Sequence, residues 1–122
     1  MSNVDVDKNL MVSHETTGGP FVGVFMFRMK EGMRLADFFA ELATFSMDVV
    51  TEIQGETIYS GKVEAEFTTG ETYWDHFILI RFTNWEEFRK TVTESEIISK
   101  QNAVRRKYLD DFNWVFTTPS GG

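Results

Sequence analysis

The sequence predicts a single α+β domain with the element order β-α-β-β-α-β, and three observations lead to that prediction. Short stretches that are rich in Val and Phe, or that alternate apolar and polar residues, indicate strands. Two longer stretches carry apolar residues at three- and four-residue steps, which indicates amphipathic helices. The chain of 122 residues suits one hydrophobic core. This order is that of a ferredoxin-like sandwich, in which both helices cover one face of an antiparallel sheet.

The first half of the domain is expected to run strand, helix, strand. Residues 21–30 are apolar on both faces of the predicted strand, which is typical of a strand at the centre of a sheet. Residues 35–53 repeat Leu, Phe, Val and Ile at helical spacing. Residues 57–67 alternate and predict a second strand, with Tyr59 and Gly61 on the face that the helices cover.

The second half is expected to run strand, helix, strand again. After the turn "TTGET", a third strand is predicted from about residue 73 to residue 82. Thr83 opens "TNWE", a capping box that marks the start of a helix. This helix is predicted to bend near residues 93–95 and to continue through residues 96–111. Residues 112–119 predict the last strand, which Pro119 ends.

The face of the sheet away from the helices is expected to be too apolar to stay in water. A contiguous apolar patch of this kind normally marks an interface, and a second copy of the chain related by a two-fold axis is its simplest cover. We therefore expect a homodimer in which two sheets meet as a dimeric α/β barrel. The residues expected on this face are Val22, Val24, Met26, Phe77 and Leu79, with the charged Arg28, Lys62, Glu64, Glu66, Asp75 and Arg81.

Composition excludes several classes of function. The net charge of -7 disfavours nucleic acid and anionic membranes as partners. The chain has no cysteine, which excludes disulfides, thiolate nucleophiles and Cys-ligated zinc and fits a reducing compartment. Asp5 and Asp7 stand where a secretion signal would be basic, so a cytoplasmic location is expected. Residues 1–19 are interpreted as a flexible N-terminal extension, residues 20–119 as the domain and residues 120–122 as a tail.

Metal ions and other cofactors are not expected. His14 and His76 are the only imidazoles, and neither has a carboxylate at ligand spacing within a helix. The basic run "VRRKY", residues 104–108, is expected to complement the carboxyl end of its helix.

The segment that begins with "YWDHFILIRF" and continues through the second helix resembles the dimeric α/β-barrel superfamily, and is closest to its small families of unknown function. The matching positions are Asp75, Phe82, Ser95 with Ile98, and Arg105. In those families an aromatic residue usually stands where this chain has Ile98.

This resemblance covers roughly residues 20–119 and implies the ferredoxin-like fold and a homodimer. A more distant similarity is to antibiotic-biosynthesis monooxygenases and polyketide cyclases. The wider superfamily also includes haem-degrading enzymes, isomerases and members with no known reaction, so the fold by itself does not select an activity.

A candidate site is expected between the sheet and the helices. By alternation His76 points toward the helices, and Gly23 and Gly61 on neighbouring strands are expected to leave a gap beside it.

The residues expected to act at this site are His76 as general base, Tyr59 as hydrogen-bond donor to a developing oxyanion, and Trp74 with Phe25 as the apolar wall. The alternative is that His76 is a rim residue bonded to backbone or water, with Trp74 acting in packing.

Two functions of different classes follow. The first is a cofactor-independent monooxygenase or cyclase that acts on a small hydrophobic aromatic or polyketide-like substrate. The second is a non-catalytic dimeric module that binds a ligand or a partner. A third reading, in which the acidic outer surface docks a basic protein, stays open.

Overall fold

The computed structural model of the chain describes residues 4–5, 20–53, 55–94 and 96–119, without the side chains of residues 45–53, 94 and 97. The expected order of elements is confirmed, and the second helix is divided in two. The elements are β1 (Phe21–Met29), α2 (Leu35–Ile53), β2 (Gly55–Lys62), the short 3-10 helix η1 (Ala65–Phe67), β3 (His76–Phe82), α3 (Trp85–Glu94), α4 (Ile97–Tyr108) and β4 (Leu109–Thr117).

The predicted extension and tail lie almost wholly outside the described residues. Of residues 1–19 only two are described: Val4 is buried against the core and Asp5 forms an ion pair with Arg106 at 2.7 Å.

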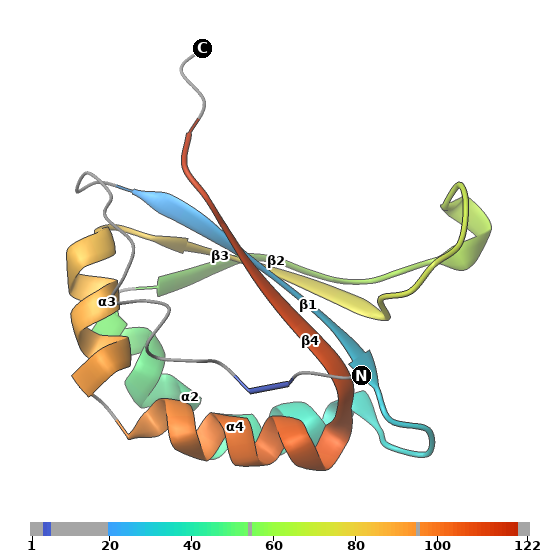
Figure 1. The fold of residues 1–122 in the computed structure, drawn as a ribbon, viewed down its shortest axis with the longest axis horizontal. Helices are drawn as coiled ribbons and strands as arrows, with labels where there is room; N and C mark the ends of the chain where they lie inside the picture. Colours follow the sequence, from blue (N-terminus) through green and yellow to red (C-terminus); the bar gives the residue numbers. More distant parts are fainter. Residues whose placement is uncertain (1–3, 6–19, 54, 95, 120–122) are drawn as a thin grey trace.

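The strands form one antiparallel sheet in the order β2-β3-β1-β4, with α2, α3 and α4 on the same face (Figure 1). This is the ferredoxin-like arrangement, so the predicted fold class is confirmed. The apolar strand β1 is central, as expected, and pairs with β3 on one side and β4 on the other. Its Phe21, Phe25 and Phe27 are buried under the helices.

The core between sheet and helices consists of two aromatic clusters. In the first, the ring of Phe82 lies 4.9 Å from that of Phe21 and 4.6 Å from that of Phe88. In the second, the ring of Phe27 lies 5.3 Å from that of Phe38 on α2. Each cluster therefore packs one end of the helical layer against the sheet.

Strand β2 differs from its prediction because it contains a β-bulge. Its pairing with β3 shifts by one residue between Thr57 and Tyr59. Side chains alternate with period two, so one extra residue sends every later side chain to the opposite face. Tyr59 pairs with Leu79 away from the helices, and the expectation that Tyr59 and Gly61 face the helices is wrong. Lys62 moves the other way, opposite His76.

Several boundaries also differ. Strand β4 begins at Leu109, within the stretch that was expected to continue the second helix to residue 111. Strand β2 ends at Lys62, so Glu64 and Glu66, which were expected on the sheet, lie at and within η1. The side chain of Asn84 caps α3, because its Oδ1 accepts a hydrogen bond from the Glu87 amide at 3.1 Å. Asparagine is as good an N-cap as threonine, and here the backbone enters the helix one residue later than predicted.

The face of the sheet away from the helices is covered by none of the described elements (Figure 1). We call it the open face, and Tyr59 at its edge is 60% exposed. Arg81 and Glu56 form an ion pair of 2.7 Å across it. Its apolar residues are Val22, Val24, Met26, Phe77, Leu79 and Val115.

Candidate functional site

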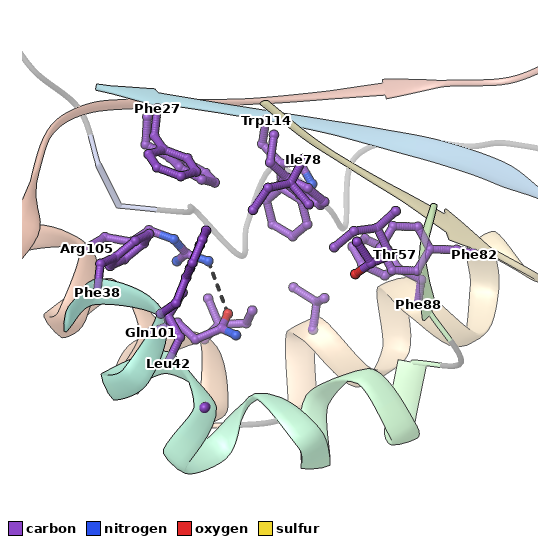
Figure 2. A pocket seen from close by; sticks show the side chains of 17 residues that line it. Phe27, Phe38, Leu42, Thr57, Ile78, Phe82, Phe88, Gln101, Arg105 and Trp114 are labelled. Atoms are coloured by element: carbon purple, nitrogen blue, oxygen red, sulfur yellow. Dashed lines mark hydrogen bonds between the residues drawn. The ribbon is translucent and has the colours of Figure 1, made fainter. Parts of the chain in front are cut away.

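A cavity of about 280 Å³ lies between the sheet and the helices. Seventeen residues from β1, β2, β3, β4 and all three helices line it (Figure 2). All of them are apolar except Thr57, Gln101 and Arg105. The chemistry of the lining therefore favours an organic molecule over an ion or a sugar.

The two aromatic clusters explain why this space is unfilled. Phe rings stand between sheet and helices at both ends, whereas Leu42 and Ala43 of α2 form the wall between them. The helix is held away from the sheet by the large rings, and the smaller side chains in the middle do not reach across. Figure 2 shows Arg105 and Gln101 at one end of the cavity, and Thr57, Phe82 and Phe88 at the other.

Arg105 is the charged residue of this lining, and it is only 7% exposed. Its Nη1 donates to Oδ1 of Asn102 at 2.7 Å, and its Nη2 donates to Oε1 of Gln101 at 3.1 Å. The guanidinium lies over the ring of Phe112, 4.7 Å from its centre. Positions 101, 102 and 105 share one face of α4 because they are three and four residues apart, so the helix itself holds the guanidinium in place.

Burial also changes the ionisation of this group. Loss of hydration lowers the pKa of Arg105 to about 10, and the negative charge of Asp5 opposes the shift. The guanidinium is still cationic at neutral pH. A positive charge therefore faces an apolar cavity.

His76 points toward the helices, as predicted, but it does not line the cavity. Its ring is stacked on Phe27 at 5.2 Å and lies edge-on to Phe39 at 5.7 Å, and these two rings do line it. Nε2 shares a hydrogen bond of 2.9 Å with Oγ of Ser60. Nδ1 is buried and has no hydrogen-bond partner among the described residues. The imidazole is one side chain away from the cavity.

The other predicted site residues are not gathered around His76. Tyr59 is on the opposite face of the sheet, where its ring lies against Gly61. Trp74 precedes β3 and packs on Tyr73 with ring centres 4.9 Å apart. Phe25 does form part of the cavity wall, next to Trp114.

The predicted origin of the gap is also wrong. The space beside Gly23 is filled by the rings of Phe25, Phe82 and Phe116, and Gly61 faces the other way. The cavity lies instead under the middle of α2.

Sequence reasoning missed the polar end of the cavity. The run of residues 104–108 was expected to complement the carboxyl end of its helix. In the structure Arg106 and Lys107 pair with Asp5 and Glu41 at the surface. Arg105 is different because it is one helical turn after Gln101 and donates a hydrogen bond to it. That four-residue spacing was the available signal.

Lowering the pH below 6.5 is expected to reduce the free energy of unfolding through His76. Burial lowers the pKa of this imidazole from its ordinary 6.5, so between the two values the unfolded chain binds a proton that the folded chain resists. Above 6.5 both forms are neutral, and His76 adds no pH dependence. Urea unfolding over a pH series measures the effect, with His76→Gln as the reference. Equal slopes for wild type and variant in this range would contradict a lowered pKa.

The described part of the chain lacks the features of two other classes of site. No cluster of three or more His, Asp or Glu there is arranged to hold a metal ion. None of the helices formed by these residues has the length and apolar character needed to cross a membrane.

Comparison with known proteins supports the fold. The chain is similar to a protein of unknown function from Rhodopseudomonas palustris, with 14% identity, a TM-score of 0.76 and 100% of each chain covered. It is also similar to a hypothetical Arabidopsis thaliana protein, with 14% identity, a TM-score of 0.59 and 90% and 96% of the two chains covered. A third similar structure is a dimeric protein of unknown function and ferredoxin-like fold from Bacteroides fragilis, with 12% identity, a TM-score of 0.52 and 83% and 97% covered. Neither the protein-family models nor the curated proteins contain a match to this chain.

Proposed function

We propose that this protein binds a small hydrophobic ligand in the cavity between its sheet and its helices, and that it does so as a homodimer joined through the open face. The observation that supports ligand binding best is the cavity itself, with a volume of about 280 Å³ and an almost wholly apolar lining. Ligand pockets of proteins typically have about 300–1,000 Å³ and few polar groups. The volume of this cavity is just below that range.

The lining is suited to binding because it is already rigid. Phe25 lies 4.9 Å from Trp114, and Phe88 packs edge-on to the same indole at 5.6 Å. Interlocked rings lose little conformational entropy when a ligand enters, and this leaves more of the contact energy as affinity.

The homodimer is supported by the open face. Val24 and Leu79 lie opposite each other near its centre, and Val115 on β4 extends the patch and is 40% exposed. The similar structure from Bacteroides fragilis is described as dimeric. In a two-fold dimer the open face of one copy would pack against the open face of the other. Both partners would then contribute the same apolar residues to the interface.

Ligand binding is tested with 1-naphthylamine, an uncharged probe small enough for this cavity, whose emission shifts to shorter wavelength in apolar surroundings. Wild type is expected to bind it saturably. The Leu42→Trp variant is expected to lower its affinity by about tenfold or more, because the indole would occupy the cavity. Affinities come from fluorescence titrations at constant protein concentration.

The matched control is Ala40→Trp, which adds an indole to the same helix at an exposed position that does not line the cavity. Its affinity for the probe should equal that of wild type. Equal loss in both variants, or no saturable binding by wild type, would refute ligand binding in this cavity.

The second candidate is the cofactor-independent monooxygenase or cyclase, and one observation favours it. Nδ1 of His76 is buried without a partner among the described residues, and the lowered pKa keeps the ring neutral at pH 7. Such an imidazole can accept a proton once Phe27 or Phe39 moves aside. Turnover of an enolisable hydrophobic substrate that is lost in His76→Gln, with probe binding retained, distinguishes this candidate from binding alone.

A further inference from the structure

We infer that the cavity selects ligands that carry a single carboxylate, which Arg105 binds. This inference rests on the proposed ligand-binding function and names the chemical class of its ligand. The ligand would be a monocarboxylic acid with an aliphatic or aromatic body, oriented with its head at α4.

The first argument is the cost of a buried charge. A guanidinium that leaves water loses hydration worth several kcal/mol, and proteins normally recover this by pairing it with an anion. Arg105 is 7% exposed, and within the described part of the chain its hydrogen bonds go to the amide oxygens of Gln101 and Asn102. The ion pairs formed by described residues involve other cations, including the neighbouring Arg106, which pairs with Asp5. An anion in the cavity would neutralise the buried charge.

The second argument is geometry. A guanidinium has five N–H donors in one plane, and the two hydrogen bonds from Nη1 and Nη2 leave others available. The planar fork matches both oxygens of a carboxylate. The guanidinium of Arg105 lies over the ring of Phe112 and is hydrogen-bonded to Gln101 and Asn102. These contacts keep the guanidinium from rotating.

The third argument is charge balance. A phosphate monoester carries about -1.5 to -2 charges at neutral pH and would leave excess negative charge in an apolar cavity. A carboxylate carries one, which matches the single cationic side chain of the lining. The net charge of the chain is -7, so its overall field repels anions and cannot by itself produce selectivity for one.

The fourth argument is shape. Arg105 is at one end of the cavity, and Phe82 and Phe88 are at the other (Figure 2). A molecule with a charged head and an apolar body would place each part against matching side chains. At the packing density of protein interiors, ~0.75, a cavity of about 280 Å³ holds roughly 200 Å³ of ligand, which is on the order of a dozen non-hydrogen atoms. Decanoate has this size and serves as the probe.

The experiment compares decanoate with decan-1-ol, which has the same chain and no charge, by isothermal titration calorimetry at pH 7. Wild type is expected to bind decanoate about 10- to 100-fold more tightly than decan-1-ol, the range for hydrogen bonds to a charged group. Arg105→Gln is expected to lose this preference and to keep its affinity for decan-1-ol. Arg106→Gln changes the adjacent but exposed arginine and should leave both affinities unchanged.

The outcomes separate this inference from the proposed function. Equal affinity of wild type for the two probes overturns carboxylate selection, while ligand binding stands. A preference for decanoate that survives in Arg105→Gln removes Arg105 as its cause. Binding of 1-naphthylamine without binding of decanoate also overturns the inference. The comparison of decanoate with decan-1-ol on wild type needs no variant. It therefore tests carboxylate selection even where Arg105→Gln does not fold.

Discussion

The Leu79→Asp variant is expected to sediment as a monomer of 14.1 kDa, and wild type is expected to sediment at twice that mass. Leu79 is paired with Val24 on one side and Tyr59 on the other, near the middle of the open face. In the proposed dimer each copy would bury an unpaired carboxylate there, and burial of a charge without a partner costs several kcal/mol. Leu79 is only half-buried within one chain, so the monomer should keep its fold. Sedimentation equilibrium measures the mass.

The matched control for this prediction is Ser99→Asp, which adds the same charge to the exposed side of α4. It should sediment like wild type. A wild-type monomer at micromolar concentration, or a Leu79→Asp variant that stays dimeric, would show that the open face is not the interface between two copies.

Phe82→Ala is expected to lower the free energy of unfolding by about 3–5 kcal/mol, the usual cost of removing a large ring from a core. The side chain is 0% exposed, and its ring packs between those of Phe21 and Phe88. The loss would also extend the existing cavity, since Phe82 already lines it. Urea unfolding at a fixed protein concentration measures the change, because the proposed dimer would make stability depend on concentration.

Phe67→Ala is the control for this prediction. It removes the same ring from η1, where Phe67 is 86% exposed, and should change the free energy of unfolding by less than about 0.5 kcal/mol. Similar losses in the two variants would contradict the assignment of Phe82 to the core.

The sequence predicted the elements whose signal is local. The double-sided apolar pattern of residues 21–29 identified the central strand, and the helical spacing after residue 35 identified α2 with its observed bounds. The division of the second helix near residue 95 was also visible. Each of these depends on side-chain periodicity over adjacent residues, which the sequence displays directly.

The candidate site was harder to predict because it depends on register and on packing. The bulge before Tyr59 shifts the pairing of β2 with β3 by one residue. Strict alternation would place Tyr59 on the same face as His76, whereas in the structure it lies on the opposite face. Phe25 was correctly expected at the face that the helices cover, and it lines the cavity. Its role in binding a ligand stays a prediction, as do the roles assigned to His76 and Trp74.

By itself, then, the sequence determined the order of the elements, the face of each long element that is apolar, and the sheet that results. Only the tertiary structure decided where space remains between the layers and which charge faces it. The physical reason is that periodicity is a property of neighbouring residues, whereas a cavity is what remains when side chains from β1, α2, α3 and β4 meet. The sequence places Arg105 one turn after Gln101, but only the packing of α4 against Phe112 shows that this charge faces an empty space.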